Sequence, residues 1–242
     1  MSGFRFDLKK TLAELVTIIA GVLIALGGGD WWEGREERAE AKSYAERLTE
    51  ALESDLLAFK DVAGRAYSID SAALQVLDVY RGQDVPETDA AEFARLVLVA
   101  SWMPPAPAAT DTYEDLVSTG RLALLPIEVR EALRSYYGRV RVFEEREMLF
   151  RDRLASGYWL VPPRVLGPDL LPKAWTSATA KDESPLVVTK PQLEEIVRRL
   201  REIPEVSTWI ADVRLVMTQR AANYSGELAD RARAAQDVLQ VR

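Results

Sequence analysis

Four polar residues occupy positions where a helical repeat normally places apolar side chains, and they are the first candidates for chemistry: Asp70, Glu147, Arg220 and Asn223. Two carboxylates that face each other across a helical bundle could bind a metal ion or act as an acid and a base. Alternatively, a buried carboxylate is satisfied by an arginine such as Arg220 and helps to fix the register of the helices. If the site is functional, the pattern favours a small ligand bound at the level of Asp70 and Glu147.

Tyr113 and Tyr136 extend this candidate ligand-binding set, although aromatic side chains at the end of a bundle also serve simply to pack. The chain has no cysteine and no histidine, which excludes disulfides, thiolate nucleophiles, Cys/His zinc sites and His-based triads. The di-iron pattern of helical bundles also requires a Glu-x-x-His motif. Ser118 lacks the G-x-S-x-G context of a nucleophile. We therefore expect a non-enzymatic protein with no catalytic residue, no metal site and no cofactor.

The elements that position these residues are long helices with apolar seams. The first is expected over 33–82 and the second over 126–158. In each, apolar residues recur at alternating steps of three and four, which is typical of helices packed at a shallow angle. The seam of the first helix is Leu52, Leu56, Phe59, Ala63, Ala66, Asp70, Ala73, Leu77 and Tyr80, and that of the second is Val129, Leu133, Tyr136, Val140, Phe143, Glu147, Phe150 and Leu154.

Shorter helices complete the expected fold. One is capped by Thr88 or Asp89, and another covers 111–119 and ends at Gly120. Two more are expected over 191–203 and from 205 to the end. The stretch 161–191 holds six prolines and is predicted to be an irregular proline-rich loop. No alternating apolar pattern favours a sheet, so the fold class is all-α: one N-terminal transmembrane helix, then an antiparallel bundle of long helices over 33–242.

The transmembrane prediction rests on residues 12–32, which are apolar apart from Glu14 and Asp30. As a helix they would be roughly 31 Å long at about 1.5 Å per residue, which matches a bilayer core of about 30 Å. Trp31 and Trp32 lie where an aromatic belt would meet the headgroups. The alternatives are a buried core helix and a cleaved signal peptide, for which Ala25-Leu26-Gly27 resembles a cleavage site.

The flanks of this span suggest an orientation. The short tail 1–11 carries Arg5, Lys9 and Lys10, and short positive tails usually stay in the cytoplasm. We expect a single-pass protein of the bacterial inner membrane whose main domain is periplasmic. The net charge of −7 argues against a nucleic-acid partner.

The span also carries a ridge of small residues. Four-residue spacing links Ala13, Thr17, Gly21, Ala25 and Gly29, with Glu14 beside them. Small residues at this spacing let two helix backbones approach closely in a membrane. The ridge predicts a homo-oligomer or contact with another membrane protein, although glycine and alanine are common in spans for other reasons.

Two motifs resemble a family of uncharacterised bacterial single-span membrane proteins. Counting from Glu14, the glycine at Gly21, the run Val22-Leu23-Ile24-Ala25-Leu26 and Trp31 resemble its N-terminal E-I-x5-G-I-L-I-A-L-x4-W. The stretch from Thr112 to Gly120, followed by Arg130, Leu133, Tyr136 and Tyr137, resembles its T-Y-x-x-L-x-S-S-G and L-R-x-x-L-x-x-Y-Y. The sequence departs from that pattern at Gly27-Gly28-Gly29 and Trp32. The resemblance implies a retained membrane anchor and brings no established activity.

These observations favour a membrane-anchored, non-enzymatic helical protein that works through protein contacts, as a scaffold or assembly subunit. The alternative is a periplasmic module that senses a small ligand and signals through a membrane partner. A carboxylate-based enzyme is a third reading that rests on the buried acids alone.

Overall fold

The computed structural model describes the backbone of residues 8–103, 108–157, 161–179 and 185–240, and their side chains except those of 8–16, 18–33, 153–157 and 179. Throughout these ranges the regular structure is helical, with no strand. The elements are α1 (Leu8–Tyr80), η1 (Glu87–Asp89), α2 (Ala90–Val99), α3 (Asp111–Ser118), η2 (Arg121–Leu124), α4 (Ile127–Gly157), α5 (Val161–Thr179), α6 (Lys190–Glu202), α7 (Val206–Ala222), η3 (Asn223–Leu228) and α8 (Ala229–Gln240).

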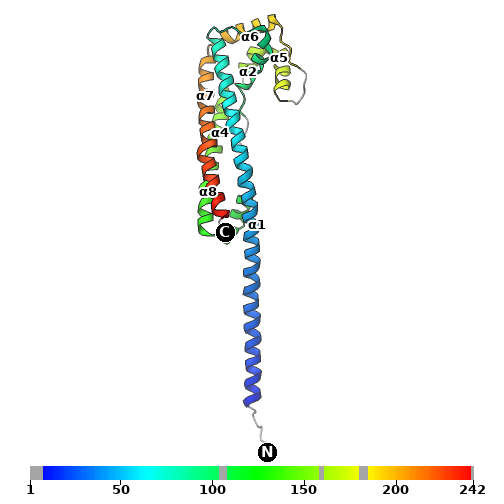
Figure 1. The fold of residues 1–242 in the computed structure, drawn as a ribbon, viewed down its shortest axis with the longest axis vertical. Helices are drawn as coiled ribbons and strands as arrows, with labels where there is room; N and C mark the ends of the chain where they lie inside the picture. The colour runs from blue at the N-terminus through cyan, green and yellow to red at the C-terminus, as the bar shows by residue number, and fades with distance from the viewer. Residues whose placement is uncertain (1–7, 104–107, 158–160, 180–184, 241–242) are drawn as a thin grey trace, which may run out of the picture.

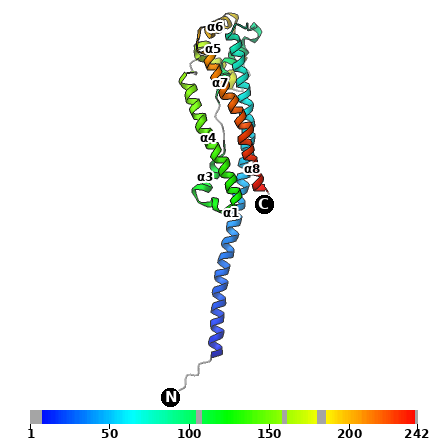
Figure 2. The same ribbon diagram turned by 90° about the vertical axis from the view of Figure 1, so that its left-hand side faces the viewer.

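The helix α1 dominates the molecule. It runs for 73 residues without a break, and its N-terminal half projects as a single helix from the bundle (Figures 1 and 2). Tyr44 is the first buried side chain along the part of α1 whose side chains are described. From there α1 packs against α7 and α8, which return antiparallel to it, and α4 completes the bundle (Figure 1). The prediction of an all-helical bundle is confirmed.

The buried face of α1 is broader than the predicted seam. Every seventh residue of that seam is buried (Leu52, Phe59, Ala66 and Ala73). Between them the deepest positions are Asp55, Val62, Ile69 and Val76. Of the predicted seam residues that lie next to these positions, Ala63 and Leu77 are also buried, whereas Leu56 and Asp70 are only half-buried. The face is wide because α1 packs against several helices, including α7, α8, α2 and α3.

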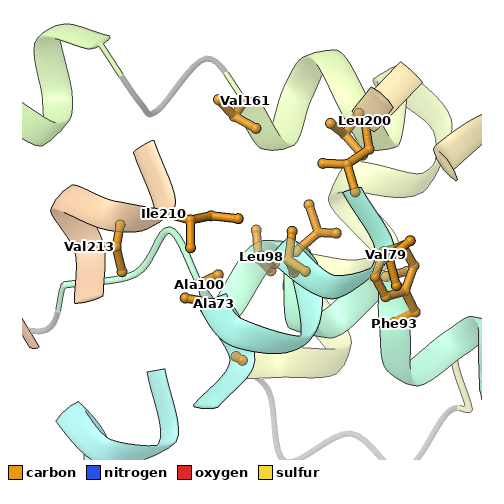
Figure 3. Packing of buried hydrophobic residues seen from close by; sticks show 14 of the residues in the cluster. Ala73, Val79, Phe93, Leu98, Ala100, Val161, Leu200, Ile210 and Val213 are labelled. Carbon is orange, nitrogen blue, oxygen red and sulfur yellow. The ribbon is translucent and has the colours of Figure 1, made fainter. Parts of the chain in front are cut away.

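The bundle contains two apolar cores, one above the other. The proximal core gathers residues 44–63 of α1 with side chains of α3, η2, α4, η3 and α8. The distal core gathers residues 66–79 of α1 with side chains of α2, α5, α6 and α7. Figure 3 shows part of the distal core, where Val79 of α1 lies beside Phe93 of α2.

The proline-rich stretch is largely helical, so the prediction of an irregular loop is wrong for residues 161–179. Pro162 and Pro163 fall in the first turn of α5, where backbone N–H groups have no helical partner in any case. Gly167, with φ 71° and ψ 174°, breaks α5 into two helical pieces. Pro168 then starts the second piece. The prolines of α5 are therefore tolerated mainly because they lie near helix starts.

The remaining elements follow the sequence closely. The helix α3 ends before Gly120, which adopts the expected left-handed conformation with φ 73°. At the start of α6, Thr189 and Gln192 form a capping box. The last long helix is interrupted by a π-helical turn over Asn223–Leu228, which the sequence did not predict.

No described helix carries a stretch long and apolar enough to cross a membrane. The predicted span 12–32 falls in the N-terminal part of α1, where the structure describes the helical backbone and, apart from Thr17, no side chains.

Candidate functional site

A buried ion pair joins α4 to α7. The Nε of Arg220 lies 2.8 Å from Oε1 of Glu147, and its Nη2 donates to Oε2 over 3.4 Å. Arg220 retains 4% and Glu147 8% of its possible exposure. Tyr224 lies one helical turn beyond Arg220; the guanidinium carbon of Arg220 is 5.8 Å from the centre of the Tyr224 ring, and the charge of Glu147 acts on the Tyr224 hydroxyl. Three side chains from two helices thus form one buried polar cluster.

The ion pair faces a cavity of about 310 Å³. Its walls are apolar on α4 and α7, and three further polar side chains (Arg146, Gln219 and Asn223) lie around the pair. The complete lining is Met103, Phe143, Arg146, Glu147, Phe150, Val216, Gln219, Arg220 and Asn223. The cavity is as large as the smaller ligand sites found in proteins.

Burial and ion pairing have opposite effects on the pKa of Glu147. Burial raises the pKa of the Glu147 carboxyl, and the charge of Arg220 and the hydrogen bond from Tyr224 oppose that rise. Burial also raises the pKa of the Tyr224 hydroxyl, and the charge of Glu147 adds to the effect. Tyr224 therefore stays a hydrogen-bond donor at neutral pH, while the ionisation of Glu147 depends on keeping its partners.

A π-helical turn follows directly after this cluster's arginine. It begins at Asn223, directly after the last turn of α7 that carries Arg220. A π-turn adds a residue to the helical ring, which rotates the following side chains relative to those before it. Asn223 and Tyr224 are the first two residues of this turn, and Asn223 continues the α-helical spacing of Val216, Gln219 and Arg220 along the cavity lining. Such turns are frequent at functional sites.

The structure brings together only part of the predicted ligand-binding set. Glu147, Arg220 and Asn223 line one cavity. Asp70 does not line it: its Oδ1 accepts a hydrogen bond from Nε of Arg214 at 2.9 Å, at the half-exposed edge of the α1–α7 contact. The two acids predicted to face each other therefore each have a different arginine partner.

Tyr113 and Tyr136 belong to a second polar cluster, which is centred on Asp55. Asp55 keeps 2% of its exposure; its Oδ2 accepts from the Tyr136 hydroxyl at 2.6 Å, and its Oδ1 accepts from the Ala109 backbone N–H at 2.8 Å. The Tyr137 hydroxyl donates to the Ala109 carbonyl at 3.4 Å, and Tyr113 stacks on Tyr137 with ring centres 4.3 Å apart. The cluster ties the segment before α3 to α1 and α4.

Sequence reasoning missed Asp55, although a signal was present. Counting from Leu48, steps of four and three lead through Leu52 and Asp55 to Phe59. Asp55 therefore occupies a seam position as good as that of Asp70. Burial raises the pKa of the Asp55 carboxyl, and its two hydrogen bonds, the first from Tyr136, partly offset the rise.

Within the described part of the chain, no three Asp, Glu, His or Cys side chains gather closely enough to hold a metal ion. The predicted association residues Ala13, Glu14, Gly21, Ala25 and Gly29, and the interface residues Trp31 and Trp32, lie outside the described side chains. Thr17 is described and is exposed.

Comparison with models of protein families, with curated proteins and with solved structures gives no match for this chain.

Proposed function

We propose that the protein is a non-enzymatic, membrane-anchored spacer that holds a helical head away from the bacterial inner membrane and acts through contacts with other proteins, as a scaffold or assembly subunit. One observation carries this proposal: α1 continues unbroken from the apolar segment 12–32 to Tyr80 at the far end of the bundle. The resemblance of the N-terminal motif to single-span membrane proteins supports the same anchor.

The dimensions of α1 suit a spacer. At about 1.5 Å per residue, the helix from Trp32 to Tyr80 would extend roughly 70 Å from the bilayer surface. Residues 35–39 are exposed and mostly charged, as expected of a lone helix that crosses water between the membrane and the bundle. A continuous helix transmits position and orientation better than a flexible linker of the same length.

The distal end of the molecule offers a surface for partner contact. An apolar cavity of about 350 Å³ opens between the end of α2 and α5, and Trp102 and Trp175 lie in its wall. Trp175 is 41% exposed. The rest of the lining is Leu98, Ser101, Pro162, Pro163, Leu171, Pro172 and Thr176. Exposed aromatic residues in an apolar depression are typical of protein contact sites.

Anchoring is tested by extracting cell membranes with alkaline carbonate. The full chain should stay in the membrane pellet, whereas the double variant Val22→Arg with Ala25→Arg should move to the supernatant, because charges at the centre of a span are costly. An alkaline phosphatase fusion at Arg242 should be active if the head is periplasmic. A wild-type chain released by carbonate would overturn the anchor.

Partner contact is tested by placing a photo-reactive residue at Trp175 in living cells. A discrete cross-linked adduct should form there. The matched control is the same residue at Leu57, which is 72% exposed but lies on α1 at the level of the proximal core, away from the distal cavity. Adducts of equal yield at both positions, or none at Trp175, would argue against partner binding at the distal cavity.

A second candidate function is a ligand-sensing module that signals through a membrane partner. The cavity with the buried ion pair of Glu147 and Arg220 favours it, because simple packing does not require a buried charged pair to border open space.

A further inference from the structure

We infer that the cavity between α4 and α7 binds a small amphipathic monocarboxylate, with the ligand carboxylate held by Arg220 and its apolar part lying against Phe143 and Phe150. This inference rests on the ligand-sensing candidate and is independent of the spacer role.

The cavity offers a forked cation in a sheltered position. A guanidinium has five N–H donors in a planar fork that matches a carboxylate. Glu147 engages Arg220 unevenly, with one contact of 2.8 Å and one of 3.4 Å. A second carboxylate arriving through the cavity would meet the same guanidinium. Because the site is desolvated, a charge-assisted hydrogen bond formed there is stronger than one at the surface.

The charge of the lining favours an anion. Two arginines, Arg146 and Arg220, lie in the cavity wall against one acid, Glu147. Two charged residues outside the lining also interact with Glu147. The charge of Arg151 opposes the rise that burial causes in the pKa of Glu147, and the charge of Glu147 adds to the rise that burial causes in the pKa of Glu144. Arg151 and Glu144 carry opposite charges, so together they leave the balance of the lining unchanged. A ligand with a single negative charge would balance the wall, whereas an ammonium ligand would face an excess of positive charge.

The rest of the wall defines the other end of the ligand. Four apolar side chains, Met103, Phe143, Phe150 and Val216, line the cavity. The amides of Gln219 and Asn223 can hydrogen-bond the second carboxylate oxygen or a polar substituent. A volume of about 310 Å³ suits a small ligand rather than a peptide or a long acyl chain. A short chain or a single ring with one carboxylate meets all of these conditions.

The inference is tested with 4-phenylbutyrate as the probe and the full chain reconstituted in lipid nanodiscs. Calorimetric titration should show saturable binding of 4-phenylbutyrate. Two isosteres, 4-phenylbutanol and 4-phenylbutylamine, share the apolar part but are neutral and cationic, and both should bind at least ten-fold more weakly. Empty nanodiscs provide the blank for partition into lipid.

Three variants test whether the probe binds in this cavity. Arg220→Lys keeps the charge but loses the fork, and it should weaken binding of the carboxylate at least ten-fold. The matched control is Arg214→Lys, which changes an arginine of the same helix that pairs with Asp70 outside the cavity; its affinity should equal that of the wild type. Val216→Phe fills the apolar side and should weaken binding while leaving Arg220 in place. Thermal unfolding of each variant reports whether it folds.

The binding results distinguish a wrong site from a wrong class of ligand. Equal binding of the carboxylate to the wild type and to the folded Arg220→Lys and Val216→Phe variants would place the ligand elsewhere and overturn the inference. Preferential binding of the alcohol or the amine, lost in Val216→Phe, would refute the carboxylate class and leave the sensing candidate intact. If none of the three probes bound, the inference would fail, and the spacer proposal would still be decided by its own cross-linking test.

Discussion

Phe143 and Phe150 lie two turns apart on α4 yet pack into different apolar cores, Phe143 into the proximal core and Phe150 against the distal one. The ion pair of Glu147 and Arg220 lies between them, at the level where one core ends and the other begins. A charged layer at this level penalises any sliding of α4 along α7, because a shift of one turn would bury each charge among apolar side chains.

The first prediction concerns this charged layer. Arg220→Ala leaves the Glu147 carboxylate buried without its cation and should lower the free energy of unfolding by about 3–5 kcal/mol. Replacing both partners, as in Glu147→Leu with Arg220→Met, should recover most of that loss, because an apolar pair of similar volume carries no desolvation cost. Urea unfolding of the solubilised chain measures both. A double variant no more stable than Arg220→Ala would show that the pair is not the source of the effect.

The second prediction concerns the pH dependence set by Asp55. Burial raises its pKa above the ordinary value of 3.8, so the folded protein holds the proton more tightly than the unfolded chain. The stabilising effect of the protonated group is complete below the unfolded pKa and is lost as the pH rises through the folded pKa. Asp55→Asn has a similar shape and does not titrate. We therefore compare the free energy of unfolding of the wild type with that of Asp55→Asn. The value for the wild type should fall relative to that of the variant as the pH rises.

The control for that prediction is Asp55→Ala. It leaves both the Ala109 N–H and the Tyr136 hydroxyl without their acceptor. Because neither alanine nor asparagine titrates, Asp55→Ala should be less stable than Asp55→Asn by about 2–3 kcal/mol at every pH. Urea midpoints measured between acidic and neutral pH provide the comparison. If the wild type gained stability relative to Asp55→Asn as the pH rose, Asp55 would be stabilised as the carboxylate; if the difference stayed flat, folding would leave its pKa unchanged, and either result would contradict the prediction.

The sequence patterns predict which face of a helix is buried better than they predict which of two adjacent rows lies deeper. The sequence predicted α4 and its seam through Phe143 and Glu147 correctly, because one row of apolar residues decides which face is buried. On α1 it placed Asp70 in the core and overlooked Asp55. Both residues continue a regular spacing from Leu52, and only the positions of the neighbouring helices decide which of two adjacent rows is deeper.

Two backbone features had no usable signal in the sequence. The count of prolines over 161–191 predicted a loop, but their effect depends on position relative to Gly167 and to the helix starts. The π-helical turn after Ala222 depends on how the last helix fits between the two cores, and no residue type specifies it. The cavity beside Glu147 lies between α4 and α7, so its residues could be proposed from sequence, but their grouping depends on how these two helices face each other.

The third prediction concerns Gly167. Its φ of 71° is strained for any residue with a side chain, and an added Cβ would lie 2.6 Å from Nη1 of Arg199. Gly167→Ala should therefore destabilise the protein by about 1–3 kcal/mol. The matched control is Gly138→Ala in the middle of α4, where nothing lies within 4 Å of the added Cβ. That control should stabilise the helix by about 0.5–1 kcal/mol. Thermal unfolding of the two variants should shift in opposite directions.

The fourth prediction concerns the end of α1. Nε of Arg201 donates to the Val79 carbonyl at 3.1 Å and Nη2 donates to the Gln83 carbonyl at 3.2 Å, so a cation from α6 caps the C-terminal end of the long helix. Arg201→Ala should cost about 1 kcal/mol. Arg198→Ala, three residues away on α6, removes only exposed ion pairs with Glu195 and Glu202 and should have almost no effect. Equal losses in the two variants would contradict the capping role.

The last prediction concerns self-association through the segment 12–32. Small residues recur every four positions from Ala13 through Gly21 to Gly29, and a ridge of this kind suits a close, right-handed crossing of roughly −40° between two helices. Close approach of backbones supplies packing energy that lipid-exposed side chains cannot, because lipid tails are as apolar as leucine. Gly21→Leu should therefore convert an oligomer into a monomer in mild detergent without preventing membrane insertion.

The control for this test is Val22→Leu, which enlarges a neighbouring residue off the ridge and should leave the oligomer intact. Multi-angle light scattering of the detergent-solubilised protein gives the mass of each variant. Because α1 continues from the ridge into the bundle, a dimer formed there would also hold two heads side by side, and the yield of a cross-link between copies through Thr17 should fall in Gly21→Leu alone. A monomeric wild type would contradict this prediction, and the small residues would then be ordinary constituents of the segment 12–32.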